Sequence, residues 1–232
     1  MKPRDLVEIK IFDTMERAQG CPICTLMNEN VERLVDTILY ELVNDPQIRG
    51  DLRTSGLCKR HTQMIEKYLE HHPELGLLGI AIIYEDLLQN QIDLMTQNSL
   101  DSIRNRGCYL CEHENEIEKT YLSSFSRIFN ENDGLNLYEK SNSILCLYHY
   151  YKISAVVDES FAESLKRIQH AKLSNLKDQL SLFIRKHDYR NKEPFGKEAT
   201  AYKIVGALMA KPVNLSIRRN SKWQIWKSSK ER

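Results

Sequence analysis

The strongest constraint in this 232-residue sequence is a Cys/His pattern that occurs twice. A Cys-x-x-Cys motif at 21–24 is followed by a Cys-x-x-His motif at 58–61, and the same two motifs return at 108–111 and 146–149. The offset between copies is 87 residues for the first motif and 88 for the second. The inner spacers are 33 and 34 residues, and all six cysteines are used. Spacing this regular indicates an internal repeat.

The residue types in these motifs are ligands for a metal ion. Thiolates and imidazoles bind Zn²⁺ tetrahedrally, and a closed set of four protein ligands is typical of a structural site. Three cysteines and one histidine per repeat predict two such sites and two Zn²⁺ ions per chain. A Cys-x-x-His motif at the start of a helix would place its two ligands one turn apart on one face. The predicted ligands are Cys21, Cys24, Cys58, His61, Cys108, Cys111, Cys146 and His149.

The sequence leaves the pairing of the four motifs open. A helix over 25–43 would carry the chain roughly 28 Å from the first Cys-x-x-Cys. The connection 44–57 could span about 45 Å if it were extended, which would allow a return and favours pairing within each repeat. An exchange, in which Cys21 and Cys24 meet Cys146 and His149, satisfies the same lengths.

Other chemistries for the cysteines are less well supported. A redox Cys-x-x-Cys is expected after a strand in a βαβ unit, which the sequence does not predict. Covalent haem attachment needs Cys-x-x-Cys-His, whereas Thr25 and Glu112 follow the second cysteines. The sequence contains no Glu-x-x-His, so the di-iron bundle pattern is missing. An iron–sulfur cluster with three thiolates and one histidine is a chemically feasible alternative to zinc.

The rest of the sequence predicts an all-α fold. Apolar residues recur at helical spacing, and glycine and proline are scarce at nine and six residues. We expect helices over about 3–19, 25–43, 74–105, 159–186 and 197–210. A polar connection of roughly a dozen residues should follow the second of these helices and its counterpart in the second half. We therefore predict a body of two duplicated zinc-binding units with a closing helix.

The predicted domain organisation follows the repeat and the charge. The body would occupy 1–210, with pseudo-repeats over about 15–105 and 106–190, and 211–232 would form a basic tail. Residues 1–150 carry 24 acidic and 15 basic side chains, whereas 151–232 carry 8 and 18. Such an asymmetry can hold two parts of a chain together or attract an acidic partner.

The sequence also predicts where the protein resides. It has no run of 18 or more apolar residues that would span a bilayer. The residues after Met1 lack the long apolar core and cleavage site of a secretory signal. We therefore expect a cytoplasmic protein without a membrane interaction.

The segment 182–199 resembles the end of a prokaryotic family of unknown function. That family has a helical body, Cys-x-x-Cys motifs alternating with Cys-x-x-His, and a closing segment similar to FIxKxDYRNKxxxxG. The resemblance covers about residues 15–210. The chain departs from it at His187, where an aromatic residue is usual, at Phe195 in place of tryptophan, and in the basic tail. The resemblance implies no activity.

Two segments outside the metal motifs are candidates for recognition. Asp188, Tyr189, Arg190 and Lys192 could present charge and a flat aromatic face. The favoured alternative is a structural turn, in which Asp188 and Asn191 satisfy backbone groups and Tyr189 packs on the body.

The basic tail has seven basic residues against one acidic and contains both tryptophans, Trp223 and Trp226. It could bind nucleic acid through phosphate contacts and base stacking, or it could be solvated or docked on the acidic body.

Taken together, these features predict a zinc-stabilised binding or regulatory protein without catalytic activity. Its partner would be an unidentified protein or a second copy of itself. The alternatives are a thiol redox or metal-dependent enzyme, and nucleic-acid binding through the tail.

Overall fold

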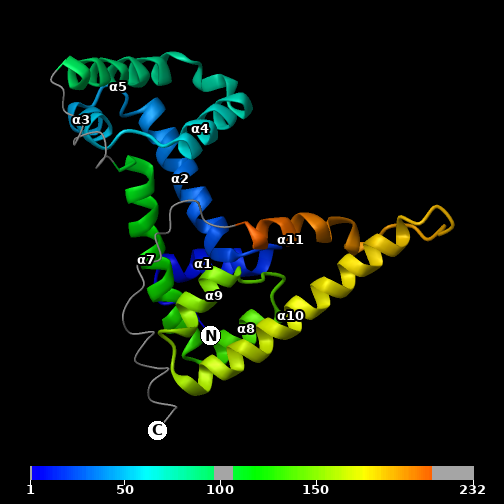
Figure 1. Cartoon of the computed structure of the whole chain (residues 1–232). Helices are drawn as coiled ribbons and strands as arrows, with labels where there is room; N and C mark the ends of the chain where they lie inside the picture. Colours follow the sequence, from blue (N-terminus) through cyan, green and yellow to red (C-terminus); the bar gives the residue numbers. More distant parts are fainter. Residues whose placement is uncertain (1, 97–106, 211–232) are drawn as a thin grey trace, which may run out of the picture.

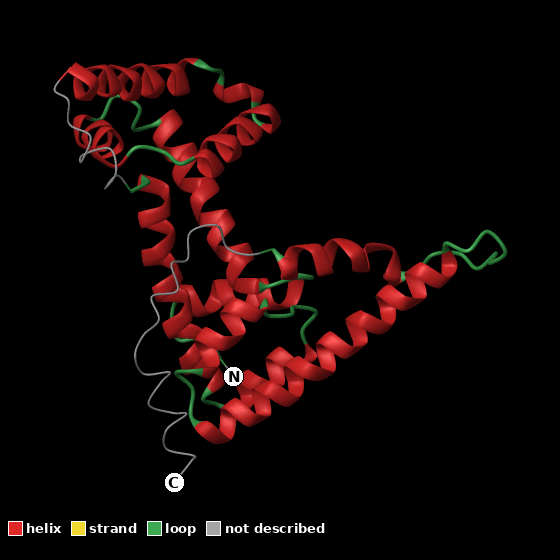
Figure 2. Ribbon diagram, viewed as in Figure 1, coloured by secondary structure: helices red, strands yellow, loops and turns green. Residues whose placement is uncertain are grey.

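The computed structural model of the protein describes residues 2–96 and 107–210, and these ranges are helical. They contain ten α-helices, two short 3₁₀ helices and no strand (Figure 2). The all-α prediction is therefore confirmed. The basic tail and the last part of the helix predicted over 74–105 lie outside the described residues. No helix in the described ranges is long and apolar enough to cross a membrane.

The helices follow one another with short connections. In chain order they are α1 (Leu6–Arg17), α2 (Pro22–Tyr40), α3 (Pro46–Ser55), α4 (Lys59–His71), η1 (Pro73–Leu75), α5 (Leu78–Thr96), α7 (Tyr109–Phe129), α8 (Asn132–Lys140), α9 (Leu147–Ser154), α10 (Glu159–Lys186), η2 (Lys197–Thr200) and α11 (Ala201–Met209).

Two long helices, α2 and α7, lie side by side and connect the two ends of the molecule (Figure 1). They are antiparallel, because Leu26 near the start of α2 shares a hydrophobic cluster with Phe125 in the second half of α7. At the opposite end, Val35 of α2 clusters with Leu110 at the start of α7. The Asn30 amide also donates a 2.6 Å hydrogen bond to the hydroxyl of Tyr121. The pair therefore forms a frame on which α1, α3, α4, α5, α8 and α9 pack directly, and α10 is attached through α8.

One end of this frame carries what we call the large lobe, formed by α1, α8, α9, α10 and α11 (Figure 1). Its core contains the fully buried aromatic side chains Phe125, Phe129 and Tyr138. The Tyr138 hydroxyl accepts a hydrogen bond from the backbone N–H of Leu145 at 3.0 Å and donates one to Gln169. Buried polar groups need such partners, so this network fixes how α8 and α10 pack.

The other end carries the small lobe, formed by α3, α4, η1 and α5 (Figure 1). Its core is mainly aliphatic and includes Leu52, Ile65 and Ile83. The Asp86 carboxylate of α5 pairs with Arg49 of α3 and, at 3.2 Å, with Arg53. The lobe is thus held by a modest apolar core and a cluster of ion pairs on its surface.

Two details of the predicted helices are wrong. The polar connections expected after the 25–43 helix and its counterpart are the helices α3 and α8. In α3, Pro46 occupies the first turn and the Asp45 side chain accepts two backbone N–H groups, a strong start signal. The helix expected from residue 74 begins at Leu78, because the chain first forms η1 and then turns at Gly76, whose φ is 63°. The two pseudo-repeats stay a prediction.

Candidate metal centres

All four Cys/His motifs lie at the beginning of a helix. Cys21, Cys58, Cys108 and Cys146 are the N-cap residues of α2, α4, α7 and α9, and none of the four side chains makes a capping hydrogen bond. The second ligand of each motif follows three residues later, in the first turn. A helix N-terminus carries a partial positive charge, which stabilises a thiolate there. The sequence therefore places a cysteine at the electropositive N-terminus of each of four helices, where a thiolate is stabilised.

Site 1 joins the start of α2 to the start of α9. It consists of Cys21, Cys24, Cys146 and His149, whose ligand atoms all lie within 4.8 Å of one another. His149 Nδ1 lies 3.3 Å from the sulfurs of both Cys21 and Cys24 and 3.2 Å from that of Cys146. The sulfurs of Cys24 and Cys146 are 3.8 Å apart. All three cysteines are free thiols. A backbone hydrogen bond of 2.9 Å from the N–H of Ile144 to the carbonyl of Gly20 reinforces the junction.

Site 2 joins the start of α4 to the start of α7. It consists of Cys58, His61, Cys108 and Cys111, again within 4.8 Å of one another. His61 Nδ1 lies 3.2 Å from the sulfur of Cys108 and 3.5 Å from those of Cys58 and Cys111. The sulfurs of Cys58 and Cys111 are 3.8 Å apart. The two sites therefore have the same ligand set and nearly the same geometry.

The pairing crosses the repeats, so the favoured within-repeat pairing is wrong and the exchange is correct. The helix α2 carries the chain away from Cys21 as expected. The residues that follow do not return it, because most of 44–57 forms α3, and a ten-residue helix advances only about 15 Å. Cys58 therefore stays at the far end of α2, where the antiparallel α7 begins with Cys108. By the same geometry, α7 returns the chain to the region of Cys21, and Cys146 follows there.

Each histidine is oriented by a buried carboxylate on α7. Nδ1 faces the sulfurs, so Nε2 points away from them, and in His61 it also lies 2.9 Å from Nη2 of Arg60. Nε2 of His149 lies 3.1 Å from Oε1 of Glu118, and Nε2 of His61 lies 3.3 Å from Oε1 of Glu114. Carboxylates in this position fix the ring orientation and the tautomer of a metal-ligating histidine.

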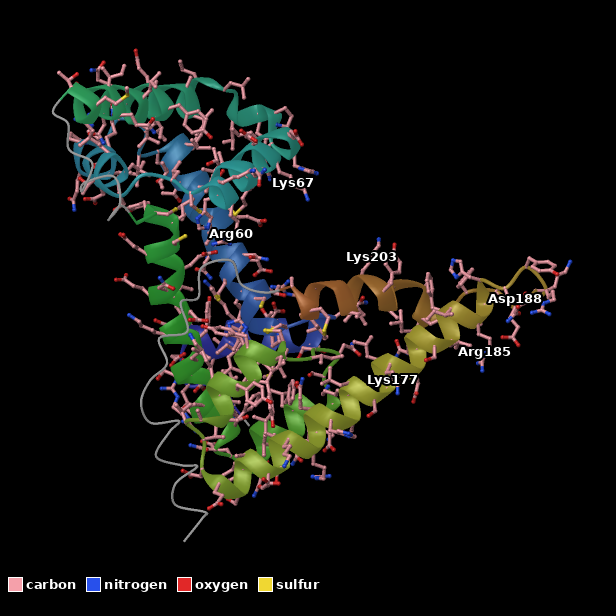
Figure 3. The ribbon with its side chains drawn as sticks, viewed as in Figure 1. Arg60, Lys67, Lys177, Arg185, Asp188 and Lys203 are labelled. Carbon is pink, nitrogen blue, oxygen red and sulfur yellow. The ribbon has the colours of Figure 1, made fainter. Side chains whose placement is uncertain are left out.

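Each of these carboxylates also has a cationic partner from the helix of its histidine. Lys152 donates a 2.6 Å hydrogen bond to Glu118, and Arg60, at the start of α4 (Figure 3), pairs with Glu114. The cations compensate the negative charge that two buried carboxylates add beside the thiolates. Each site therefore combines four Cys/His side chains with a carboxylate that orients the histidine and a cation that pairs with this carboxylate.

The sequence prediction missed Glu114 and Glu118, although one signal was present. Glu114 follows Cys111 by three residues, which places it on the same helix face. Glu118 is one turn further along, where it reaches the other site. At the positions offset by 87 residues, α2 carries Met27 and Val31. Both supporting carboxylates therefore come from one helix.

Site 1 without a metal holds crowded ionisable groups. Hydrogen bonds from Cys21 and Cys24 lower the pKa of the Cys146 thiol far below its usual range, whereas the same crowding and burial raise the pKa of Cys24. Burial by itself would lower the pKa of His149, but its hydrogen bonds with Cys146, Cys21 and Glu118 raise it to about 11. Cys24 and His149 therefore hold their protons when no metal is bound. A metal ion would have to displace these protons to use the same lone pairs.

Site 2 shows the same behaviour to a smaller extent. Burial alone would raise the pKa of the Cys108 thiol, but the hydrogen bond with His61 and the backbone N–H groups of Cys111 and Cys58 lower it to about 6. Burial would lower the pKa of His61, yet its contacts with Cys108 and Glu114 raise it to about 9. The stabilised thiolate is a form that is ready to bind a cation.

The other candidate residues lie away from both sites. Asp188 is at the far end of α10 (Figure 3), and its carboxylate accepts a 3.0 Å hydrogen bond from the backbone N–H of Arg190 and pairs with the Arg190 guanidinium. Asn191 likewise accepts the N–H of Glu193. These bonds confirm the predicted turn. The expected packing of Tyr189 on the body is wrong, because this side chain is 90% exposed.

The remaining recognition candidates are Lys192, Trp223 and Trp226. Lys192 lies in this exposed segment. Trp223 and Trp226 lie outside the described residues.

Comparison with known proteins places the chain in a family. A model described as a family of unknown function, DUF6062, matches residues 1–202. The chain belongs to this family. An uncharacterised 23.9 kDa protein from the xynA 3′ region of Caldicellulosiruptor sp. (strain Rt8B.4) is 27% identical to it over 180 residues, which cover 74% of this chain and 84% of that protein. No solved structure matches the chain. DUF6062 membership confirms the resemblance seen in the sequence.

Proposed function

We propose that both centres hold structural Zn²⁺ and that the protein is a zinc-stabilised helical scaffold with a binding or regulatory role and no catalytic activity. The observation that carries this proposal is the spacing of the ligand atoms. A tetrahedral zinc ion with ordinary bond lengths requires about 3.8 Å between two sulfur ligands and about 3.5 Å between sulfur and nitrogen. The 3.8 Å and 3.2–3.5 Å separations at both sites match these values.

The same arrangement favours a structural role over a catalytic one. A catalytic zinc site keeps one coordination position for water or substrate, whereas four protein ligands close the ion. In both sites the fourth ligand is a histidine that is buried and hydrogen-bonded to a carboxylate. Each ion would join helices that are far apart in the sequence, so its binding energy would contribute to folding.

The rival proposals have weaker support. A disulfide requires sulfurs about 2.05 Å apart, and all six cysteines are free thiols arranged around a common centre with an imidazole. An iron–sulfur cluster is compatible with the ligand types but requires space for several atoms between the ligands, whereas these ligands are spaced for one ion. Closed zinc–thiolate sites also suit a reducing compartment, so we propose that the protein is cytoplasmic.

The small lobe offers little for catalysis. A cavity of about 20 Å³ lies beneath α5 and is lined by aliphatic side chains alone. Its size is that of a single water molecule, and it presents no polar group to a substrate. The side chains that line it are Val35, Ile38, Leu39, Leu52, Leu57, Ile65, Ile80, Ile83 and Leu110.

Metal analysis tests the proposal directly. The full-length protein, purified without added metal, should contain about two zinc ions per chain by elemental analysis. A strong chelator should remove them and lower the melting temperature, because a structural site adds its binding energy to folding. Iron with a visible absorption spectrum, or a metal-free protein with a redox-active disulfide, would overturn the proposal.

A further inference from the structure

The helix α5 is apolar on two sides, and among the described residues only one of these sides is packed against other helices. Its inner face contributes Ile80 and Ile83 to the core of the small lobe. Its outer face carries Leu78 and Leu88, which are 74% and 60% exposed. A helix that is apolar all round is normally buried all round. The outer face therefore has the composition of an interface.

The exposed apolar residues on this face follow a regular pattern. Together with Ala81 and Glu85 they occupy steps of three and four residues along the helix, which is the spacing of a coiled-coil seam. Ile92 and Met95, which are 49% and 73% exposed, complete the pattern. The outer face, as defined here, consists of Leu78, Ala81, Glu85, Leu88, Ile92 and Met95.

The charges near this face leave the seam almost entirely apolar. No lysine or arginine occurs in α5. The Asp86 carboxylate is turned to the side, where it pairs with arginines of α3. Asp93 accepts a 2.9 Å hydrogen bond from the Gln89 side chain of the same helix. Glu85 is thus the single charged residue of the outer face.

We propose that the outer face of α5 is the contact between two copies of this chain, packed as an antiparallel helix pair about a two-fold axis. The pattern is self-complementary in this arrangement. With the axis midway between residues 85 and 88, Leu78 faces Met95 of the second copy, and Ala81 faces Ile92 of the second copy. A large side chain then lies opposite a small one, which allows the two helices to approach closely.

The exposed apolar area fits such a contact. From their exposed fractions, the outer-face residues and the neighbouring Leu77 offer about 500–600 Å² per copy, or roughly 1,000–1,200 Å² in total, which is the lower end of a specific interface. The symmetry of the seam favours a second copy over an unrelated protein, because a two-fold contact needs the same patch on both partners. The proposal rests on the binding role proposed above and names a partner for it.

Sedimentation equilibrium of the full-length, metal-loaded protein tests this contact. The chain should dimerise reversibly. Leu88→Asp should weaken the dimer by roughly 100-fold or more, because the symmetry places the substitution twice in a buried seam, each time opposite Glu85 of the other copy. Glu85→Leu should strengthen it by about tenfold, because it removes two carboxylates from an apolar contact.

Val156→Asp is the matched control. Val156 is 59% exposed in the large lobe, away from α5, so this variant should dimerise as the parent does. Each variant should also retain about two zinc ions and its helical circular dichroism. Ile92→Asp is a second seam variant in case Leu88→Asp does not fold.

A chain that is monomeric at about 100 µM, a concentration at which even a weak specific contact forms, would overturn the inference. A dimer that survives both aspartate substitutions, or one that Glu85→Leu does not strengthen, would do the same. A monomer that contains zinc would contradict the proposed dimer but not the proposed function. A parent protein without zinc would contradict the proposed function. The two failures are therefore distinguishable.

Discussion

The two lobes carry the same metal-ligand set but different hydrophobic cores. Among the described residues, the cluster around site 1 contains 21 buried apolar side chains, with Phe125, Phe129 and Tyr138 among them. The cluster around site 2 contains 12 in the same part of the chain, and the side chains that pack there are mainly aliphatic. Because apolar burial is the main favourable term in folding, the large lobe has more stability of its own. The comparison indicates that equal metal sites contribute unequal shares of the stability of the two lobes.

The support of the two sites differs in the same direction. Glu118 accepts hydrogen bonds from His149, Lys152 and Tyr148, and its side chain is 6% exposed. Glu114 contacts His61 and Arg60 and is 11% exposed. The carboxylate of site 1 is therefore the more enclosed and the more fully bonded. Site 1 has both the larger core and the better supported histidine.

Removal of metal from both sites should have the largest effect on stability, and it should destabilise the small lobe more than the large lobe. In a chelator, the backbone amides of α3, α4 and α5 should lose most of their protection from hydrogen exchange, because the small lobe has the smaller apolar core and should depend more on the proposed zinc ion. The amides in the middle of α10 and the second half of α7 should keep partial protection. Hydrogen exchange followed by mass spectrometry measures both. Equal loss in the two lobes would contradict the unequal dependence.

Single-ligand variants separate the two sites. Cys108→Ser removes a ligand of site 2 and should leave one zinc ion per chain and an unfolded small lobe on an otherwise folded large lobe. Cys146→Ser removes a ligand of site 1 and should also leave one zinc ion, with protection in α10 reduced but not lost. The comparison uses metal content and the number of thermal transitions. If Cys146→Ser unfolds the whole chain and Cys108→Ser has little effect, the ranking of the lobes is reversed.

The sequence was sufficient for the fold class and for the eight Cys/His residues that form the two candidate metal sites, because both depend on local patterns. Helical periodicity places α10 at the predicted bounds, and the spacing of cysteine and histidine identifies the motifs without any knowledge of their partners. The predicted ligands of each site lie where a helix begins, and this too is a local property. Long-range relations were harder to predict.

The pairing of the motifs could not be derived, because it depends on the conformation of the connection between them. The same 14 residues reach about 45 Å when extended and far less when they form a helix. Pro46 after Asp45 was a start signal for α3 that would have decided the question. The role of Glu118 was beyond reach, because it depends on the packing of α7 against α9, the helix that carries His149. The exposure of Tyr189 depends likewise on how far α10 extends beyond the body.

Neutral variants of the two carboxylates should have a smaller effect, which is measured as a loss of zinc affinity. The loss should be larger at site 1 than at site 2. Glu118→Gln and Glu114→Gln remove the charge but keep the shape, and loss of such a partner typically weakens metal binding by about 10–100-fold. We expect the upper part of this range for Glu118 and the lower part for Glu114. Competition with a chromogenic chelator measures both. Glu116→Gln, at an exposed position of the same helix, is the control and should leave zinc affinity unchanged.

The smallest predicted effect concerns a cation that only the larger core has to accommodate. Lys172 of α10 lies 4.8 Å above the ring of Tyr138 and donates a 2.6 Å hydrogen bond to the carbonyl of Ser141. Burial lowers the pKa of Lys172 to about 8, although Glu139 partly offsets it. An unfolded lysine titrates near 10.4, so between about pH 8 and pH 10.4 the unfolded chain binds more protons than the folded chain. Stability from this group is therefore gained as the pH rises through that window.

Lys172→Met removes the titrating ammonium group, so comparison with the parent measures the pH dependence of stability that this group causes. The stability of the parent relative to Lys172→Met should increase by about 1–2 kcal/mol from pH 8 to pH 10.4, a value reduced from the full linkage energy because the side chain is partly solvated. Denaturant unfolding at several pH values measures the difference. Lys177→Met, on the exposed side of the same helix (Figure 3), is the matched control and should run parallel to the parent. A constant difference between parent and Lys172→Met would show that the ammonium group is fully solvated in the folded protein.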